Sequence, residues 1–142
     1  MTHKVATLIE AVADTLTGLA TTGTNVEKSR GYAISATPAI SVRLASVSPA
    51  NELTNAFLDN SVDIETVFHV SGAELDLDNQ VLQIDAEVYA ALMADRTQGG
   101  AVIDTDPELL SVDSTADQET PTAIGVRKWR FFLRHSITSA EV

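Results

Sequence analysis

The sequence predicts an α+β fold, in which two α-helices pack on a mainly antiparallel or mixed β-sheet. Two segments have the spacing of amphipathic helices, and three longer segments alternate apolar with polar residues as half-buried strands do. The chain has 142 residues, of which 44% are hydrophobic, so it has the usual size of one domain and can bury a core. We therefore expect residues 1–142 to form a single domain.

The first predicted helix covers Val5 to Leu19. Its apolar residues recur at intervals of three and four positions, which gives a helix one buried stripe. Thr2 is the expected N-cap, and Gly18 or Gly23 the expected stop. Charged residues interrupt the segment, so it is neither a signal peptide nor a membrane span. We expect an intracellular, soluble protein.

The first half of the chain also contains the first predicted strands. Asn25 to Tyr32 fits either a short strand or an extended link. Ala39 to Ser46 alternates apolar and polar residues and is predicted to be a strand. Ser48 to Asn60 begins with Ser-Pro and contains several Asn and Asp residues, which favours a loop. Val62 to Val70 gives the longest alternating pattern of this half, and its polar face is acidic.

A second helix is predicted from Asn79 to Met93. Asp78 can cap it, with Leu77 and Leu82 as a hydrophobic staple, and Gln98 to Gly100 should end it. The residues expected on its buried face are Val81, Ile84, Val88 and Leu92.

The second half of the chain closes with a long amphipathic strand, predicted from Val126 to Thr138. Ala101 to Ile103 and Leu109 to Val112 are short strand candidates, and the polar segment Asp113 to Thr122 is predicted to be a mobile loop. In the closing strand, Trp129, Phe131, Leu133 and Ile137 should face one way, and Lys128, Arg130 and Arg134 the other, with Phe132 among them.

The charges are distributed unevenly along the chain. Its net charge is −11, yet sixteen Asp or Glu and a single basic residue, Arg96, lie between Leu44 and Val126. Four cations then follow within eight residues: Arg127, Lys128, Arg130 and Arg134. The acidic excess argues against wrapping around nucleic acid. It fits a solvated acidic surface, a surface that mates with a copy of itself, or a salt-adapted host.

Catalytic and metal-binding patterns are absent from the sequence. There is no cysteine, no G-x-S-x-G motif and no Gly-rich phosphate loop. His3, His69 and His135 lack the spacing of a zinc site. The acidic segment Glu74 to Asn79 lacks the glycine and the closing glutamate of a calcium loop. We expect no catalytic residue, no metal and no cofactor, and hence a protein that is not an enzyme.

The basic closing strand allows three interpretations. Its cations and Phe132 could hold a single nucleic-acid strand, or the cations could pair with Asp63 and Glu65 on a neighbouring strand of the same sheet. Alternatively, the basic edge of one subunit could meet the acidic face of the next. The third interpretation predicts a subunit interface that contains Lys128, Arg130, Arg134, Asp63 and Glu65.

Taken in order, these elements resemble the tail-terminator, or tail-completion, proteins of tailed phages. The similarity covers most of the chain and lies in arrangement, with no catalytic motif. The segments that carry it are Val5 to Leu19, Pro38 to Arg43, Val62 to Val70, Leu82 to Met93 with the following Asp95-Arg96 and Gly99-Gly100, and Trp129 to Arg134. The long acidic segment Asp113 to Thr122 departs from the family's pattern.

The resemblance implies a virion protein of the tail and neck, assembled in the host cytoplasm. It would form a hexameric ring at the head-proximal end of the tail tube, end tube assembly, and join the tail to the neck. Its partners would be copies of itself, the tail-tube protein and head-tail connector proteins, with no membrane. DNA would pass through the lumen without specific binding, since an acidic lumen repels phosphates.

Three alternatives stay open. The chain could be a head-tail connector or a minor tail protein from the same setting. Outside that setting it could be a monomeric ligand-binding α+β domain or, with least support, a hydrolase.

Overall fold

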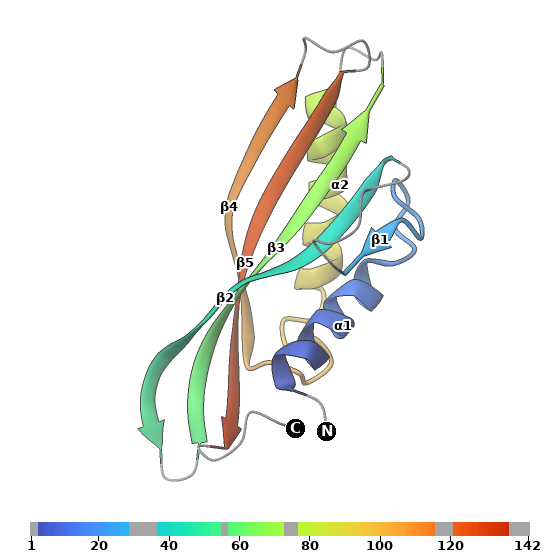
Figure 1. The fold of residues 1–142 in the computed structure, drawn as a ribbon. Helices are drawn as coiled ribbons and strands as arrows, with labels where there is room; N and C mark the ends of the chain where they lie inside the picture. The colour runs from blue at the N-terminus through green and yellow to red at the C-terminus, as the bar shows by residue number, and fades with distance from the viewer. Residues whose placement is uncertain (1–2, 29–36, 55–56, 73–76, 116–120, 137–142) are drawn as a thin grey trace.

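The computed structural model describes residues 3–28, 37–54, 57–72, 77–115 and 121–136. These residues form two helices and five strands (Figure 1). Their bounds are α1 Lys4–Leu16, β1 Val26–Glu27, β2 Ala39–Thr54, β3 Phe57–Ser71, α2 Leu77–Met93, β4 Asp104–Thr115 and β5 Thr122–Ser136.

The five strands form one mixed sheet in the order β1-β2-β3-β5-β4. β1 runs parallel to β2, and all other neighbours are antiparallel. Both helices lie on the same face of the sheet, where their apolar sides and those of the strands form the hydrophobic core (Figure 1). The predicted α+β fold is confirmed, with the parallel β1 making the sheet mixed.

Helix α1 begins one residue before its predicted range and ends inside it. His3 is the N-cap, and its Nδ1 accepts a hydrogen bond from the backbone N–H of Val5 at 3.1 Å. The predicted cap, Thr2, lies outside the described residues. The helix ends at Leu16 because Gly18 has a φ of 97°, in the left-handed region where a helix cannot continue.

Helix α2 has the predicted buried face but a different first turn. Val81, Ile84, Val88 and Leu92 are fully buried, as expected. Asp78 lies inside the first turn, where its charge still favours the helix N-terminus. The predicted staple is wrong, since Leu77 is buried whereas Leu82 is 48% exposed. Leu82 lies five residues after Leu77. At about 100° per residue, its side chain is rotated by about 140° from that of Leu77 around the helix axis and points away from the sheet.

The end of α2 agrees with the predicted range, Asn79 to Met93. The helix stops at Met93, before the segment Gln98 to Gly100. Gln98 has a positive φ of 51° and is buried, and its Nε2 donates to the carbonyls of Leu92 and Asp95 at 2.9 Å. The side chain of Gln98 thus binds a carbonyl group left unpaired at the helix end.

The predicted loop Ser48 to Asn60 is wrong. β2 continues to Thr54 and β3 begins at Phe57, so the two strands form one long hairpin that extends below both helices in Figure 1. Pro49 and the polar residues after it had suggested a loop. The structure accommodates them in a register shift between Pro49 and Leu53, after which the strands pair again.

Other strand predictions were partly right. Within Asn25 to Tyr32, Val26 and Glu27 form β1, and residues beyond Lys28 lie outside the described part. Ala101 to Ile103 is a turn, not a strand. Leu109 to Val112 belongs to the longer β4. The predicted loop Asp113 to Thr122 overlaps the end of β4 and the start of β5, and residues 116–120 are outside the described residues.

Strand β5 has the predicted alternation. Trp129, Phe131 and Leu133 are buried against the helices, whereas Ile137 lies outside the described residues. The indole N–H of Trp129 donates to the hydroxyl of Thr66 at 3.0 Å, so this buried polar group is satisfied.

Gly125 sets the distance between β5 and α2. A Cβ at this position would lie 2.3 Å from Cγ1 of Val81 and 3.2 Å from Cδ2 of Phe68. The helix can therefore approach the sheet this closely only because residue 125 has no side chain.

We predict that Gly125→Ala destabilises the fold by about 1 to 3 kcal/mol, because the new methyl group must displace Val81. Denaturant unfolding would measure the change. Val81→Ala makes room for the methyl group, so the double variant should lose less than the sum of the two single losses. Additive losses would contradict the close contact.

Candidate functional site

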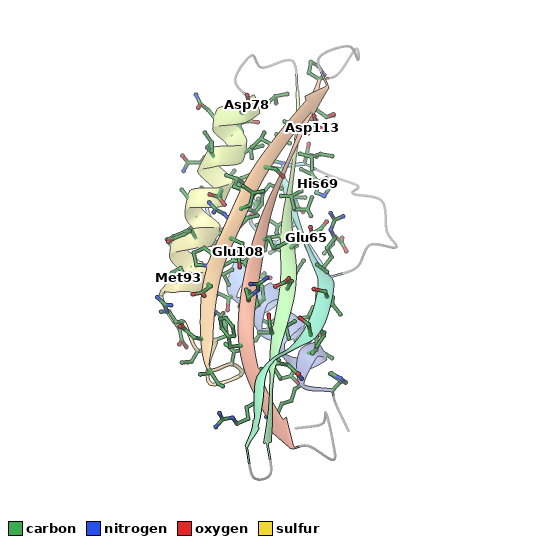
Figure 2. The ribbon with its side chains drawn as sticks, turned by 90° about the vertical axis from the view of Figure 1, so that its left-hand side faces the viewer. Glu65, His69, Asp78, Met93, Glu108 and Asp113 are labelled. Carbon is green, nitrogen blue, oxygen red and sulfur yellow. The ribbon has the colours of Figure 1, made fainter. Side chains whose placement is uncertain are left out.

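The face of the sheet opposite the helices carries the charged residues that the sequence predicts to be functional. Asp63 and Glu65 of β3 lie directly opposite Arg130 and Lys128 of β5. Period-two alternation places all four on this face, because Ile64 and Trp129 between them point into the core. In Figure 2, Glu65 lies on the side of the sheet away from α2.

Ion pairs join these strands into a charge ladder, defined here as Arg43, Asp63, Glu65, Glu108, Lys128 and Arg130. Arg130 binds Asp63 through Nε–Oδ1 and Nη2–Oδ2 contacts of 3.0 and 3.4 Å. Its Nη1 also lies 3.5 Å from Oε1 of Glu108 on β4. Arg43 of β2 binds Glu65 at 2.9 Å. The ladder therefore spans four strands and contains three cations and three carboxylates.

The ladder neutralises itself within the subunit. Each of its ion pairs is partly exposed, and water screens such pairs, so each one adds little to the stability of the fold. Arg130 donates hydrogen bonds to the carboxylate of Asp63, and these bonds raise the pKa of Arg130. The acidic excess of the chain must then lie outside the ladder.

The structure thus shows the predicted cross-strand ion pair between Asp63 and Arg130. Glu65 instead binds Arg43 of β2. Arg134 lies farther along β5, exposed, and opposite Asp59 in the register, so it does not join this group. Contact of the five predicted residues with another subunit stays a prediction.

Lys128 differs from the other cations of the ladder. It faces Glu65 in the register but forms no ion pair within the described part of the chain. Beside it lies a shallow hollow of about 380 Å³ on the sheet surface, lined by both charged and apolar side chains. Its lining includes Glu65, Glu108, Leu109, Val126, Lys128 and Arg130. The ammonium group of Lys128 is therefore available to a carboxylate from outside the subunit.

Arg127 had been grouped with the basic closing strand, but the structure places it on the helix side of the sheet. Its guanidinium binds Asp85 of α2 through two hydrogen bonds of 3.0 and 2.7 Å, and donates to the carbonyl of Glu108 at 2.8 Å. It also lies 5.8 Å from the ring centre of Tyr89. The hydrogen bonds with Asp85 raise the pKa of Arg127.

The sequence contains a signal for this pair that the prediction missed. Arg127 lies two residues before Trp129 and four before Phe131, so the alternation of the strand places it on the same, apolar face of β5. Asp85 follows Ile84 and lies four residues after Val81, which puts it at the border of the buried face of α2. A charge on the apolar face of each of two packed elements predicts a buried ion pair.

The histidines are spread over the structure. His3 caps α1, and Nε2 of His69 lies 3.2 Å from the hydroxyl of Ser41 on β2. Burial, together with the positive charge of Arg43, lowers the pKa of His69. Neutral imidazole is thereby favoured in this cross-strand contact. Among the described residues, no group of three or more His, Asp or Glu side chains is arranged to hold a metal ion.

Comparison with known proteins does not assign the chain to a family. No family model matches the sequence, and no curated protein matches it at a significant level. Within the described residues, no helix is long and apolar enough to cross a membrane.

We predict that Asp85→Ala costs about 3 kcal/mol of stability, because it leaves the guanidinium of Arg127 without its buried partner. Asp104→Ala is the matched control: it removes a carboxylate from an exposed pair with Arg96 and should cost much less stability, because water screens this pair. Thermal and denaturant unfolding would measure both. Equal losses in the two variants would show that burial does not distinguish these pairs.

Proposed function

We propose that the protein is a tail-terminator protein of a tailed phage. Copies of the chain form a hexameric ring at the head-proximal end of the tail tube. The ring ends tube assembly and joins the tail to the neck, with the tail-tube protein on one side and head-tail connector proteins on the other. The protein acts by assembly and holds no catalytic centre.

The observation that carries this proposal is the order and layering of the elements. An amphipathic helix is followed by a long antiparallel hairpin, a second helix on the same face of the sheet, and two closing strands. The resemblance implies a fold of a sheet with helices, and the order of these elements follows the segments that carry the resemblance.

The charges suit the passage of DNA without specific binding. Arg127 and Arg130 of β5 are paired with carboxylates of the same chain, so these cations are not free to bind phosphates. The net charge of −11 also disfavours phosphate contacts. A lumen with this character would release DNA readily.

We predict that the purified protein forms a closed hexameric ring, which native mass spectrometry and sedimentation velocity would detect. Added to polymerising tail-tube protein, the ring should stop elongation and appear at one end of each tube in electron micrographs. Heat-denatured protein at the same concentration is the control. A monomer at the highest concentration measured would contradict the proposal.

We also predict that Lys128→Glu weakens subunit association, because a neighbouring carboxylate loses its partner and the acidic copies repel each other more strongly. Added salt should therefore promote association of this variant more than that of the original protein. The matched control is the exchange Asp63→Arg with Arg130→Asp, which keeps an ion pair within the subunit and should keep the ring. Sedimentation over a range of salt concentrations measures both. An unchanged ring in Lys128→Glu would remove this residue from the interface, and a weakened exchange variant would place Asp63 and Arg130 in it.

A further inference from the structure

Half of the exposed large apolar side chains lie on β2 and β4, toward the two lateral edges of the sheet. Among the described residues there are eight such side chains, and two of them, Leu44 and Val47, lie on β2. Leu109 and Val112 lie on β4, and Ile103 directly precedes it. The other three are Leu82 and Tyr89 on α2 and Ile124 on β5. Leu109 is 75% exposed and Val47 is 44% exposed. Apolar side chains gathered along strand edges indicate contact with another protein surface.

Both edges also offer backbone groups for pairing. β1 covers β2 only at Ile40 and Ser41, and no other described strand lies on that side of β2. β4 is the last strand at the opposite edge. Exposed strand edges are templates for pairing with another chain.

Only part of β4 is protected against such pairing. Its first half carries Asp104, Asp106 and Pro107, and a register shift separates Pro107 from Leu110. Acidic residues, proline and irregular register are the features that prevent edge-to-edge association. From Leu110 to Thr115 the register with β5 is continuous. The accessible part of the β4 edge is therefore this second half, where Val112 is exposed, with the exposed Leu109 directly before it.

The strand directions fit a head-to-tail junction between copies. From β2 through β3 and β5 to β4, the sheet contains four strands that alternate in direction. In a cyclic ring, neighbouring copies keep the same orientation, so β4 of one copy meets β2 of the next with opposite direction. The junction is then antiparallel, like the pairs within each subunit.

The offset between the edges fits a closed arrangement. Val47 is level with Val62 of β3, whereas Val112 is level with Phe68, six residues farther along that strand. A junction that places Val112 of one copy opposite Val47 of the next shifts the register by these six residues for every four strands. At ~3.3 Å per residue and ~4.7 Å between strands, this shift corresponds to a strand tilt of about 45° from the ring axis. Closed sheets have strand tilts of about 35 to 45°.

The two edges differ in charge. β4 holds four carboxylates and no cation: Asp104, Asp106, Glu108 and Asp113. Over Ala39 to Ser48, β2 holds no carboxylate, and its one charged residue, Arg43, is paired with Glu65 within the subunit. A β4 edge beside a second β4 edge would bring like charges together, whereas the β2 edge of a neighbouring copy brings none. A ring of copies joined in this way covers both edges in every subunit.

We propose that β4 of one copy, around Leu109 to Asp113, pairs with β2 of the next copy, around Ser46 to Ser48. This inference rests on the proposed ring and names the contact that closes it. Backbone hydrogen bonds form the junction, and Val47, Leu109 and Val112 pack beside it.

Cysteine crosslinking tests the contact directly, because the chain contains no cysteine. Val47→Cys and Val112→Cys are co-expressed as separate chains, treated with a short bismaleimide, and analysed on a denaturing gel. We expect a crosslinked dimer in the co-expressed sample and none in either variant alone. The double variant should give a ladder that ends at the ring's subunit number. Ser48→Cys with Leu109→Cys repeats the test at neighbouring positions, and Ala6→Cys on the exposed side of α1 replaces Val47→Cys as the control.

The outcomes separate this inference from the proposed function. A ring without these crosslinks, in both cysteine pairs, overturns the strand junction and leaves the ring intact. Dimers formed by Val47→Cys alone or Val112→Cys alone indicate a two-fold contact and overturn the head-to-tail junction. A ladder without a fixed end supports the junction and contradicts the closed ring. A monomer overturns both.

Discussion

The antiparallel pairing of β3 with β5 determines both faces of the sheet. In this register Ile64 lies opposite Trp129, and both side chains are buried under the helices. The residues on either side, Asp63 with Arg130 and Glu65 with Lys128, must then face the other way. A shift of one residue would turn one strand over relative to the other and would bury either Asp63 and Glu65 or Lys128 and Arg130. The hydrophobic core and the charge ladder therefore depend on the same register.

The sequence was sufficient for the elements with strong periodicity. The alternation of Val62 to Val70 and of the closing strand, and the spacing of Val81, Ile84, Val88 and Leu92, predicted both buried surfaces correctly. Each pattern there has one period and one buried side. The hairpin was missed because Pro49 and its polar neighbours resemble a loop, while the partner strand that holds them in a sheet is remote in sequence. Tertiary pairing overrides local turn preference in such a segment.

The candidate site was predicted in part for the same reason. Alternation placed Asp63, Glu65, Lys128 and Arg130 on one polar face. Composition along the chain suggested separate acidic and basic surfaces, but sequence separation is not spatial separation. Strand order brings the acidic strand beside the basic one, and most of the charges pair within the subunit. Which strands are neighbours follows from long-range contacts that local patterns do not encode.

Internal pairing changes what can drive assembly. Most cations of β5 form ion pairs within the subunit and do not attract a neighbouring copy. Copies with a net charge of −11 therefore repel each other over distances of about 8 to 10 Å at ordinary ionic strength. Backbone hydrogen bonds between strand edges carry no net charge, and apolar contacts beside them are not weakened by salt. A junction of this kind can hold acidic copies together where complementary surface charge alone cannot. Salt should then promote association by screening the repulsion, whereas the proposed contact of Lys128 with a neighbouring copy would be weakened by salt.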